Sequence, residues 1–130
     1  MKKFFWLLIV SILAAGCAKS TPAVTDNGTP GQIKITVYYD ENGNNIQDSG
    51  EPGHQDRVLV GQDVSCPPTD PAKFQFYQTD DAGQVVVKDL KPGKYCVGYS
   101  GEKTMSSKLT LDVFLSSDQE AQVSFGTLEQ

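Results

Sequence analysis

The sequence predicts an all-β protein, a seven-stranded antiparallel sandwich of two sheets (prealbumin-like or Ig-like). Three observations point to this fold. Apolar and polar residues alternate in seven short segments rich in Val, Ile and aromatic residues. Gly, Pro, Asn and Asp separate these segments. Beyond the N-terminal apolar run, the 3.6-residue apolar period of a helix does not persist anywhere in the chain.

The expected strands follow one another as QIKITVYY, RVLVGQDV, KFQFYQT, QVVVKDL, KYCVGYS, KLTLDVFLS and AQVSFGT. Because successive side chains of a strand point to opposite faces, every second residue should face the core. The residues expected to face inward are Ile33, Ile35, Val37, Tyr39, Val58, Val60, Val64, Phe74, Phe76, Val85, Val87, Leu90, Tyr95, Val97, Tyr99, Leu109, Leu111, Val113, Leu115, Ala121, Val123 and Phe125. Tyr38, Tyr77 and Phe114 would then lie on an outer face, either as scattered surface residues or as a platform for a glycan or a protein.

Three turn segments support these strand boundaries. In TDDAGQ, residues 79–84, Asp and Gly stand where a hairpin needs a positive φ angle. In LKPGKY, Pro92 fixes φ at the second position of a type II turn and Gly93 supplies the left-handed residue. CPPTDP, residues 66–71, contains too many prolines for a central strand and should form a loop.

The chain begins with two lysines and an apolar segment, MKKFFWLLIVSILAAGC. The apolar run of about ten residues is too short to span a bilayer and suits the hydrophobic region of a secretory signal peptide. LAAGC, which ends at Cys17, resembles the lipobox of bacterial lipoproteins. The resemblance implies cleavage before Cys17, acylation of its thiol and stable anchoring to a membrane by several acyl chains. An ordinary signal peptide cleaved at another position is the alternative.

These features divide the chain into three parts. Residues 1–16 are expected to be the lipoprotein signal peptide, residues 17–31 the lipidated cysteine with a flexible stalk, and residues 32–128 one β-sandwich domain. We expect the protein in the bacterial cell envelope, outside the cytoplasm, and on the outer membrane if the host is Gram-negative. Removal of the leader with its two lysines changes the formal side-chain charge from −5 to −7. This acidity argues against binding to nucleic acid or to an anionic lipid surface.

Two cysteines, Cys66 and Cys96, remain once Cys17 carries lipid. An even number of cysteines in an oxidising compartment predicts a disulfide, although two unpaired buried cysteines are the alternative. If Tyr95 and Val97 face inward, Cys96 lies on the outer side of its sheet. The bridge would then tie the CPPTDP loop to a strand.

The segment from Asp40 to Glu51 has the ligand spacing of an EF-hand loop. The expected ligands of Ca²⁺ are Asp40, Asn42, Asn44, Ile46 through its backbone carbonyl, Asp48 and Glu51. Short Asp and Asn side chains at alternate positions of a tight coil point inward together, and the longer Glu51 closes the cage. The Ile46 side chain is left free to pack. The alternative is an acidic turn that is exposed to solvent and binds no ion. If the loop binds a cation, its length and flexibility favour Ca²⁺ over Mg²⁺.

Position 6 of this loop is normally glycine, but here it is Asn45. Asn tolerates the left-handed backbone region better than other non-glycine residues, so the site should be weakened rather than lost. A strand precedes the loop, and Pro52 and Gly53 follow it, so the flanks are not the helices of an EF-hand. We therefore expect a structural clamp between strands and not a calcium sensor.

The run GQIKITVYYDENGNNIQDSGEPG, with TDDAGQVVVKDLKPGKYCV further on, resembles the SdrD B-like domains of bacterial surface proteins. The resemblance covers about residues 31–99 and belongs with the prealbumin-like and Cna-B-like sandwiches. It implies a seven-stranded sandwich, calcium binding by the same loop positions, and a role as a spacer or adhesin module. The two cysteines, the asparagine at position 6 and the single copy on a lipid anchor depart from the family pattern.

Two functions follow as expectations. The first is a calcium-binding structural or adhesion-type module that contacts an unidentified protein or glycan. The second is a carbohydrate-binding or transport-accessory lipoprotein. Catalysis is not expected, because the one histidine, His54, should be solvated and the sequence has no nucleophile elbow, phosphate loop or metal-binding histidine pair.

Overall fold

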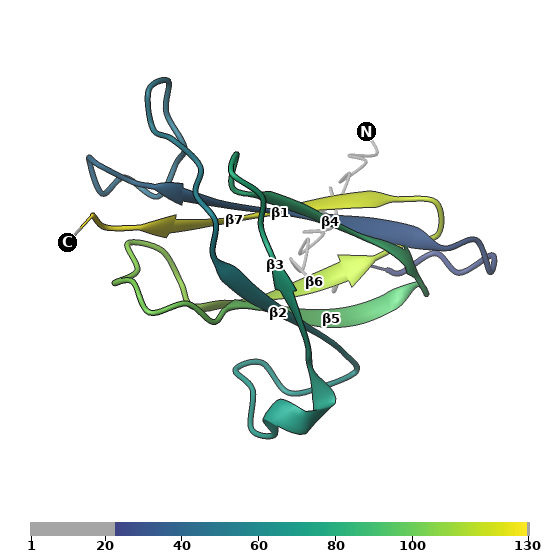
Figure 1. Ribbon diagram of the computed structural model, residues 1–130. Coiled ribbons are helices and arrows are strands. Elements are labelled where there is room, and N and C mark those ends of the chain that lie inside the picture. Colours follow the sequence, from purple (N-terminus) through teal and green to yellow (C-terminus); the bar gives the residue numbers. More distant parts are fainter. Residues whose placement is uncertain (1–22, 130) are drawn as a thin grey trace, which may run out of the picture.

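Figure 1 shows the computed structural model of the chain, which describes residues 23–129. The expected signal peptide, the lipidation site Cys17 and the first part of the stalk lie outside the described residues. The elements are β1 (Gly31–Tyr39), β2 (Arg57–Gln62), the short 3-10 turn η1 (Pro71–Lys73), β3 (Gln75–Gln78), β4 (Gln84–Leu90), β5 (Gly93–Tyr99), β6 (Thr110–Leu115) and β7 (Glu120–Thr127). The described residues contain no helix that is both long and apolar enough to cross a membrane.

The strands form the expected two sheets, with the order β4-β1-β7 in one and β3-β2-β5-β6 in the other. The expectation that every pair is antiparallel is wrong for one pair, because β1 and β7 run parallel from Gln32↔Glu120 to Tyr39↔Thr127. This pairing is available because β7 follows β6 from the opposite sheet, so its direction is not fixed by a hairpin with β1.

The core lies between the sheets and is built from the alternating residues of six strands. Its buried members are Ile33, Ile35, Val37, Val58, Val60, Val87, Tyr95, Val97, Tyr99, Val113, Leu115, Val123 and Phe125. Partly buried Val85, Leu90, Leu111 and Ala121 pack against it, as the alternation predicts. Leu109 is an exception at 55% exposed, because it precedes β6 and lies in the loop.

The third strand has the opposite orientation to the one its sequence predicts. Tyr77 packs against the core, whereas Phe76 is 50% exposed on the outer face. Phe74 is buried, but it lies on the outer side of the sheet, where it covers the space above Gly61. The alternation in KFQFYQT predicts that Phe74 and Phe76 face the core. The turn Pro71–Lys73 ends just before Phe74, and in the strand that follows the inward-facing position is Tyr77 instead.

Two further assignments at the strand ends differ from the prediction. Tyr38, expected on an outer face, is 1% exposed, and Tyr39 is half-buried instead. Val64 lies beyond the end of β2 and is also half-buried. Val64 has left its sheet, whereas Tyr38 and Tyr39 are still paired with Gly126 and Thr127 of β7.

Cys66 and Cys96 form the expected disulfide, with 5.3 Å between their Cα atoms. Cys96 pairs across the sheet with Gly61 and points to the outer face, as predicted, although it is fully buried there. Phe74 and Val64 fill the space above Gly61 beside it. The bridge therefore fastens a small apolar cluster on the outside of the four-stranded sheet.

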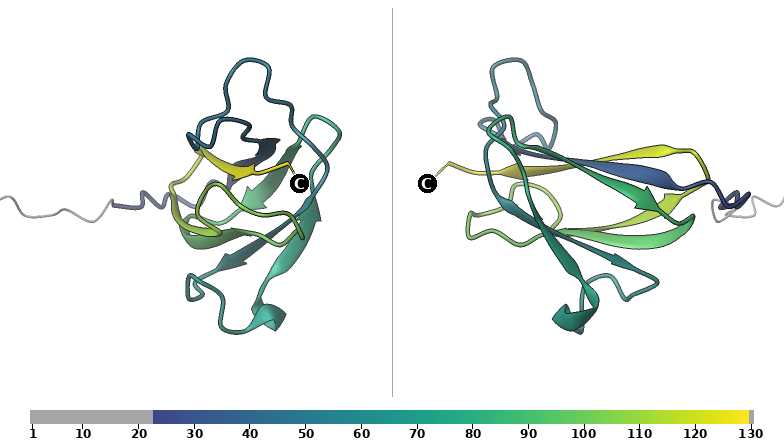
Figure 2. Two further views of the ribbon diagram at one scale, coloured as in Figure 1. Left: turned by 90° about the vertical axis from the view of Figure 1, so that its left-hand side faces the viewer. Right: turned by 45° about the vertical axis from the view of Figure 1, so that its right-hand side comes forward.

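The two ends of the described chain leave the sandwich at opposite ends of its long axis (Figure 2). The N-terminal segment is held there by the β6–β7 turn, because the Ser117 amide donates to the Thr25 carbonyl at 2.7 Å and the Asn27 amide donates to the Ser117 hydroxyl at 2.9 Å. Part of the segment expected to be a stalk is thus hydrogen-bonded to the domain.

Candidate functional site

The candidate calcium loop, Asp40–Glu51, follows β1 at the end of the sandwich opposite to the N-terminal segment (Figures 1 and 2). The C-terminal end of β7, the β3–β4 turn and the β5–β6 loop lie at the same end. Both ends of the loop are fixed to the sheet. The Asp40 amide donates to the Thr127 carbonyl at 2.8 Å, and the Tyr39 amide donates to the Pro52 carbonyl at 3.0 Å.

The first half of the loop is wound by its own side chains. The Asp40 carboxylate accepts from the Asn44 amide at 3.1 Å and from the Asn45 amide at 2.9 Å. The Asn42 side-chain oxygen accepts from the Asn44 amide at 3.0 Å, and the Asn44 oxygen accepts from the Ile46 amide at 2.8 Å. These successive Asx turns bring the alternate side chains to the inside of one coil.

The second half of the loop folds back on the first. Asp48 accepts from the side-chain amides of Asn42 at 2.8 Å and Asn44 at 2.7 Å. Glu51 accepts from the Glu41 amide with one oxygen and from the Asp48 amide with the other, both at 2.9 Å. The structure therefore brings together the five expected side-chain ligands.

The backbone at Asn45 is left-handed, with φ 64°, as the position requires. Ile46 is 62% exposed, so the expectation that its side chain packs is wrong.

The residues fit calcium by donor type. Asp40, Asp48 and Glu51 supply carboxylates, Asn42 and Asn44 supply amide oxygens, and calcium prefers such a set of hard oxygens. Within residues 23–129, none of the three carboxylates forms an ion pair with a Lys, Arg or His. The same residues contain no group of three Asp, Glu, His or Cys side chains arranged for a metal. A cation here would therefore depend on amide and backbone oxygens as well.

The segment that follows the calcium loop is held by a contact that the sequence alone does not predict. Gly53 of the EPG segment and Gly83 of the TDDAG segment lie back to back, because a Cβ atom on Gly83 would come 2.7 Å from the Gly53 Cα and 2.8 Å from the His54 nitrogen. Gly83 has the expected positive φ, 76°. The turn joins β3 and β4 of different sheets, however, so it is not the hairpin that was predicted. This close approach explains why the EPG and TDDAG segments carry glycine at these two positions, where a side chain would not fit.

Thr79, at the start of the same motif, holds the segment that follows Gly53. Its hydroxyl donates to the His54 carbonyl at 2.9 Å and accepts from the Asp56 amide at 2.8 Å. Thr79 is 1% exposed. The motif therefore clamps the chain between the calcium loop and β2.

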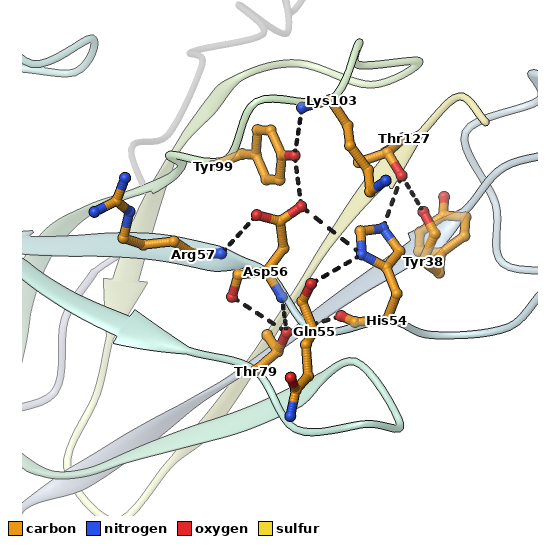
Figure 3. Close-up of polar contacts among 9 residues, drawn as sticks. All are labelled: Tyr38, His54, Gln55, Asp56, Arg57, Thr79, Tyr99, Lys103 and Thr127. Atoms are coloured by element: carbon orange, nitrogen blue, oxygen red, sulfur yellow. Dashed lines mark hydrogen bonds and ion pairs between the residues drawn. The ribbon is translucent and has the colours of Figure 1, made fainter. Parts of the chain in front are cut away.

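His54 is 9% exposed, so the expectation that it is solvated is wrong. Its Nε2 lies 2.8 Å from the Thr127 hydroxyl, which donates to the Tyr38 carbonyl at 3.1 Å (Figure 3). Its ring stacks on Tyr39 at 4.2 Å between centroids. Nδ1 faces the Asp56 carboxylate at 3.7 Å. His54 thus joins β1, β7 and the loop exit in one network.

Thr127, His54 and Asp56 have the order of a catalytic triad, but their environment suits a structural role. The Thr127 hydroxyl is fully buried and is already hydrogen-bonded to the Tyr38 carbonyl, so a substrate has no approach to it. Asp56 borders a surface hollow that Gly101, Glu102 and Lys103 also line, but Thr127 is not among the residues that line it.

Tyr99 completes this network from β5 (Figure 3). Its hydroxyl donates to Asp56 at 2.7 Å and accepts from the Lys103 amide at 3.0 Å. Burial, followed by the hydrogen bond to Asp56, raises the pKa of Tyr99 well above its usual value. Burial also raises the pKa of Tyr38 and of Tyr95, with smaller contributions from nearby carboxylates.

These three tyrosines predict a loss of stability in alkali. A pKa raised by folding contributes stability that is fully present below the unfolded value of 10.0 and is lost as the pH rises above it. We expect the melting temperature to fall steeply above about pH 10, and phenolate absorbance of these residues to appear only with unfolding. Tyr99→Phe should lower stability by about 1–2 kcal/mol at neutral pH and make the alkaline fall shallower. An equally steep fall in the variant would contradict the assignment to Tyr99.

No family model matches the chain, and no curated protein sequence matches it. Solved structures with a similar fold include a streptococcal ancillary pilin (13% identity, TM-score 0.55), the major pilin subunit of Bacillus cereus (15%, 0.52) and a minor pilin of Streptococcus agalactiae (10%, 0.50). Each match covers 78% of this chain and 33%, 30% and 46% of the respective pilin, so the chain spans less than half the length of each. At these identities the likeness establishes the fold that the chain shares with pilin subunits of Gram-positive bacteria.

Proposed function

We propose that the chain is a calcium-stabilised structural or adhesion-type module, anchored in the bacterial cell envelope through acylated Cys17. The observation that carries this proposal is the loop Asp40–Glu51, in which five oxygen-bearing side chains converge in EF-hand order. The pilin-like fold supports a structural or adhesive role over a catalytic one.

The setting of the loop favours a clamp over a sensor. An EF-hand sensor works by moving two helices, whereas this loop begins and ends in strands of one sandwich. Its entry and exit are bridged at Tyr38↔Gly53. Bound calcium would offset the repulsion among three carboxylates and would hold this end of the sandwich rigid.

The lipid anchor at Cys17 and the calcium loop would lie toward opposite ends of the domain. The segment Thr25–Thr29 runs along the β6–β7 turn at the end of the domain opposite to the calcium loop (Figure 2). A lipid on Cys17 would therefore place the calcium loop at the end of the domain farther from the membrane, where an unidentified protein or glycan partner has access.

The carbohydrate-binding alternative has less support. Of the three aromatic residues expected to form an outer platform, Tyr38 is 1% exposed and Tyr77 packs against the core. A glycan array with and without calcium separates the two functions, and specific glycan retention would favour the alternative.

Calorimetry on residues 18–130 tests calcium binding. For an affinity of about 10⁻⁴ to 10⁻⁶ M, typical of extracellular to sensor-type sites, 1 mM calcium should stabilise the domain by roughly 1.4–4 kcal/mol. Glu51→Gln, which keeps the shape of the side chain, should abolish most of this gain. Asn45→Gly should tighten binding a fewfold, because glycine relieves the left-handed backbone at φ 64°. An unchanged melting temperature of the unaltered chain in calcium would rule out the proposal.

A further inference from the structure

Ser106, in the β5–β6 loop, carries a buried hydroxyl that makes no hydrogen bond of regular geometry with any residue in the described range. The backbone around it is well paired, since the Ser106 amide donates to the Gly126 carbonyl at 3.0 Å and Met105 bridges to Thr127. A buried polar atom without a partner costs free energy and calls for an explanation.

The hydroxyl lies beside the first residue of the candidate calcium loop, because a Cβ atom added at Gly126 would meet both the Ser106 Oγ and the Asp40 Cβ. The nearby Ser106 hydroxyl is the largest influence that holds the pKa of Asp40 below its usual range, ahead of the amides of Asn45, Asn44 and Gly43, while burial opposes the shift. The Ser106 hydroxyl is thus close enough to influence the Asp40 carboxylate, although no hydrogen bond joins the two side chains in the structure.

Gly126 of β7 makes this approach possible. A Cβ atom at Gly126 would lie 3.1 Å from the Asp40 Cβ and 3.1 Å from the Tyr38 hydroxyl, and it would collide with the Ser106 hydroxyl. Glycine in a strand interior often marks such a close approach. Ser106, Gly126 and Asp40 thus form one layer across the β5–β6 loop, β7 and the calcium loop.

We propose that Ser106 is a positioning residue of the calcium site, whose hydroxyl donates to Asp40 and orients that carboxylate for the ion. This inference rests on the proposed function. It adds a side chain from a loop more than 50 residues away in sequence, outside the Asp40–Glu51 motif.

The consequence is that calcium also orders the β5–β6 loop. A hollow of about 520 Å³ is lined by Asn45 of the calcium loop and by Ser106, Ser107, Lys108 and Leu111. Its lining comes from the calcium loop on one side, and from the β5–β6 loop with Leu111 of β6 on the other. The ion therefore sets the shape of this surface at the end of the domain farther from the N-terminal segment.

Calcium titration of the unaltered chain, Ser106→Ala and Ser107→Ala tests the inference. Ser106→Ala should bind calcium about tenfold more weakly, because a hydrogen bond to a charged group is lost. Its loss of stability relative to the unaltered chain should be larger in calcium than without calcium. Ser107→Ala is the matched control. It removes a hydroxyl that accepts from the Gly126 amide at 3.1 Å, so it should lower stability equally with and without calcium.

Hydrogen exchange supplies a second measurement. Calcium should slow exchange of the amides of residues 101–109 in the unaltered chain and in Ser107→Ala, and should slow it less in Ser106→Ala. Equal calcium affinity of Ser106→Ala and the unaltered chain, within twofold, would overturn the role of Ser106 while leaving the proposed function intact. Failure of the unaltered chain to bind calcium would overturn both.

Discussion

Replacing Gly83 with alanine is expected to destabilise the domain by about 3 kcal/mol or more, which for a domain of this size lowers the melting temperature by more than about 12 °C. Two effects add. The residue has a φ angle of 76°, where an alanine is strained by about 1–2 kcal/mol. The new Cβ would also meet backbone atoms of Val37, Gly53 and His54, none of which can rotate away.

Gly28→Ala is the matched control for this effect. Gly28 has a similar φ angle of 82°, but a Cβ atom there would find nothing within 4 Å. Its loss should therefore stay within the 1–2 kcal/mol or so of backbone strain. Chemical denaturation of both variants measures the difference. Equal losses would show that the close contact between Gly53 and Gly83 contributes nothing beyond strain.

Loss of the Cys66–Cys96 disulfide is the second large effect. The bridge closes a loop with a sequence separation of 30, and the chain-entropy account gives roughly 3–4 kcal/mol for a loop of that length. The double variant Cys66→Ala/Cys96→Ala should lose about this much stability in denaturant unfolding. Total stability of a small domain is only about 5–15 kcal/mol, so the variant should be close to marginal.

Two controls accompany the disulfide variant. A reducing agent should bring the unaltered chain down to the stability of the double variant and should leave the variant itself unchanged. Residues 18–130 unfolded without reductant should expose no reactive thiol. Two reactive thiols in that assay, or a double variant as stable as the unaltered chain, would contradict the expected contribution.

The strands and most of the core were predictable because alternation is a local signal. Ile33, Ile35 and Val37 are fully buried, as period two predicts. The prediction of inward-facing residues was wrong at Phe76. The turn before β3 shifts the strand by one residue, and no local pattern in the sequence indicates that shift. The parallel pairing of β7 with β1 could not be predicted either, because it depends on which segments distant in sequence pair with each other.

The candidate calcium loop was predictable in composition and winding, because its ligands lie within one short motif. Asn45 shows this most clearly, since a left-handed residue was expected at position 6 and is found there. What surrounds the loop was not predictable. His54 is buried because Thr127 and Tyr39 approach it from other segments. Ser106 lies beside Asp40 although its loop carries no motif of its own.

The parallel pairing of β1 and β7 has a mechanical consequence. The two strands are the first and last of the domain, and they pair side by side through eight residues each. A pull on the N-terminal segment, resisted by a contact at the far end of β7, would load this ladder along the strand direction. All its hydrogen bonds would then be strained together in shear, instead of opening one after another from an end. Such a domain would resist traction along its long axis much better than traction across it.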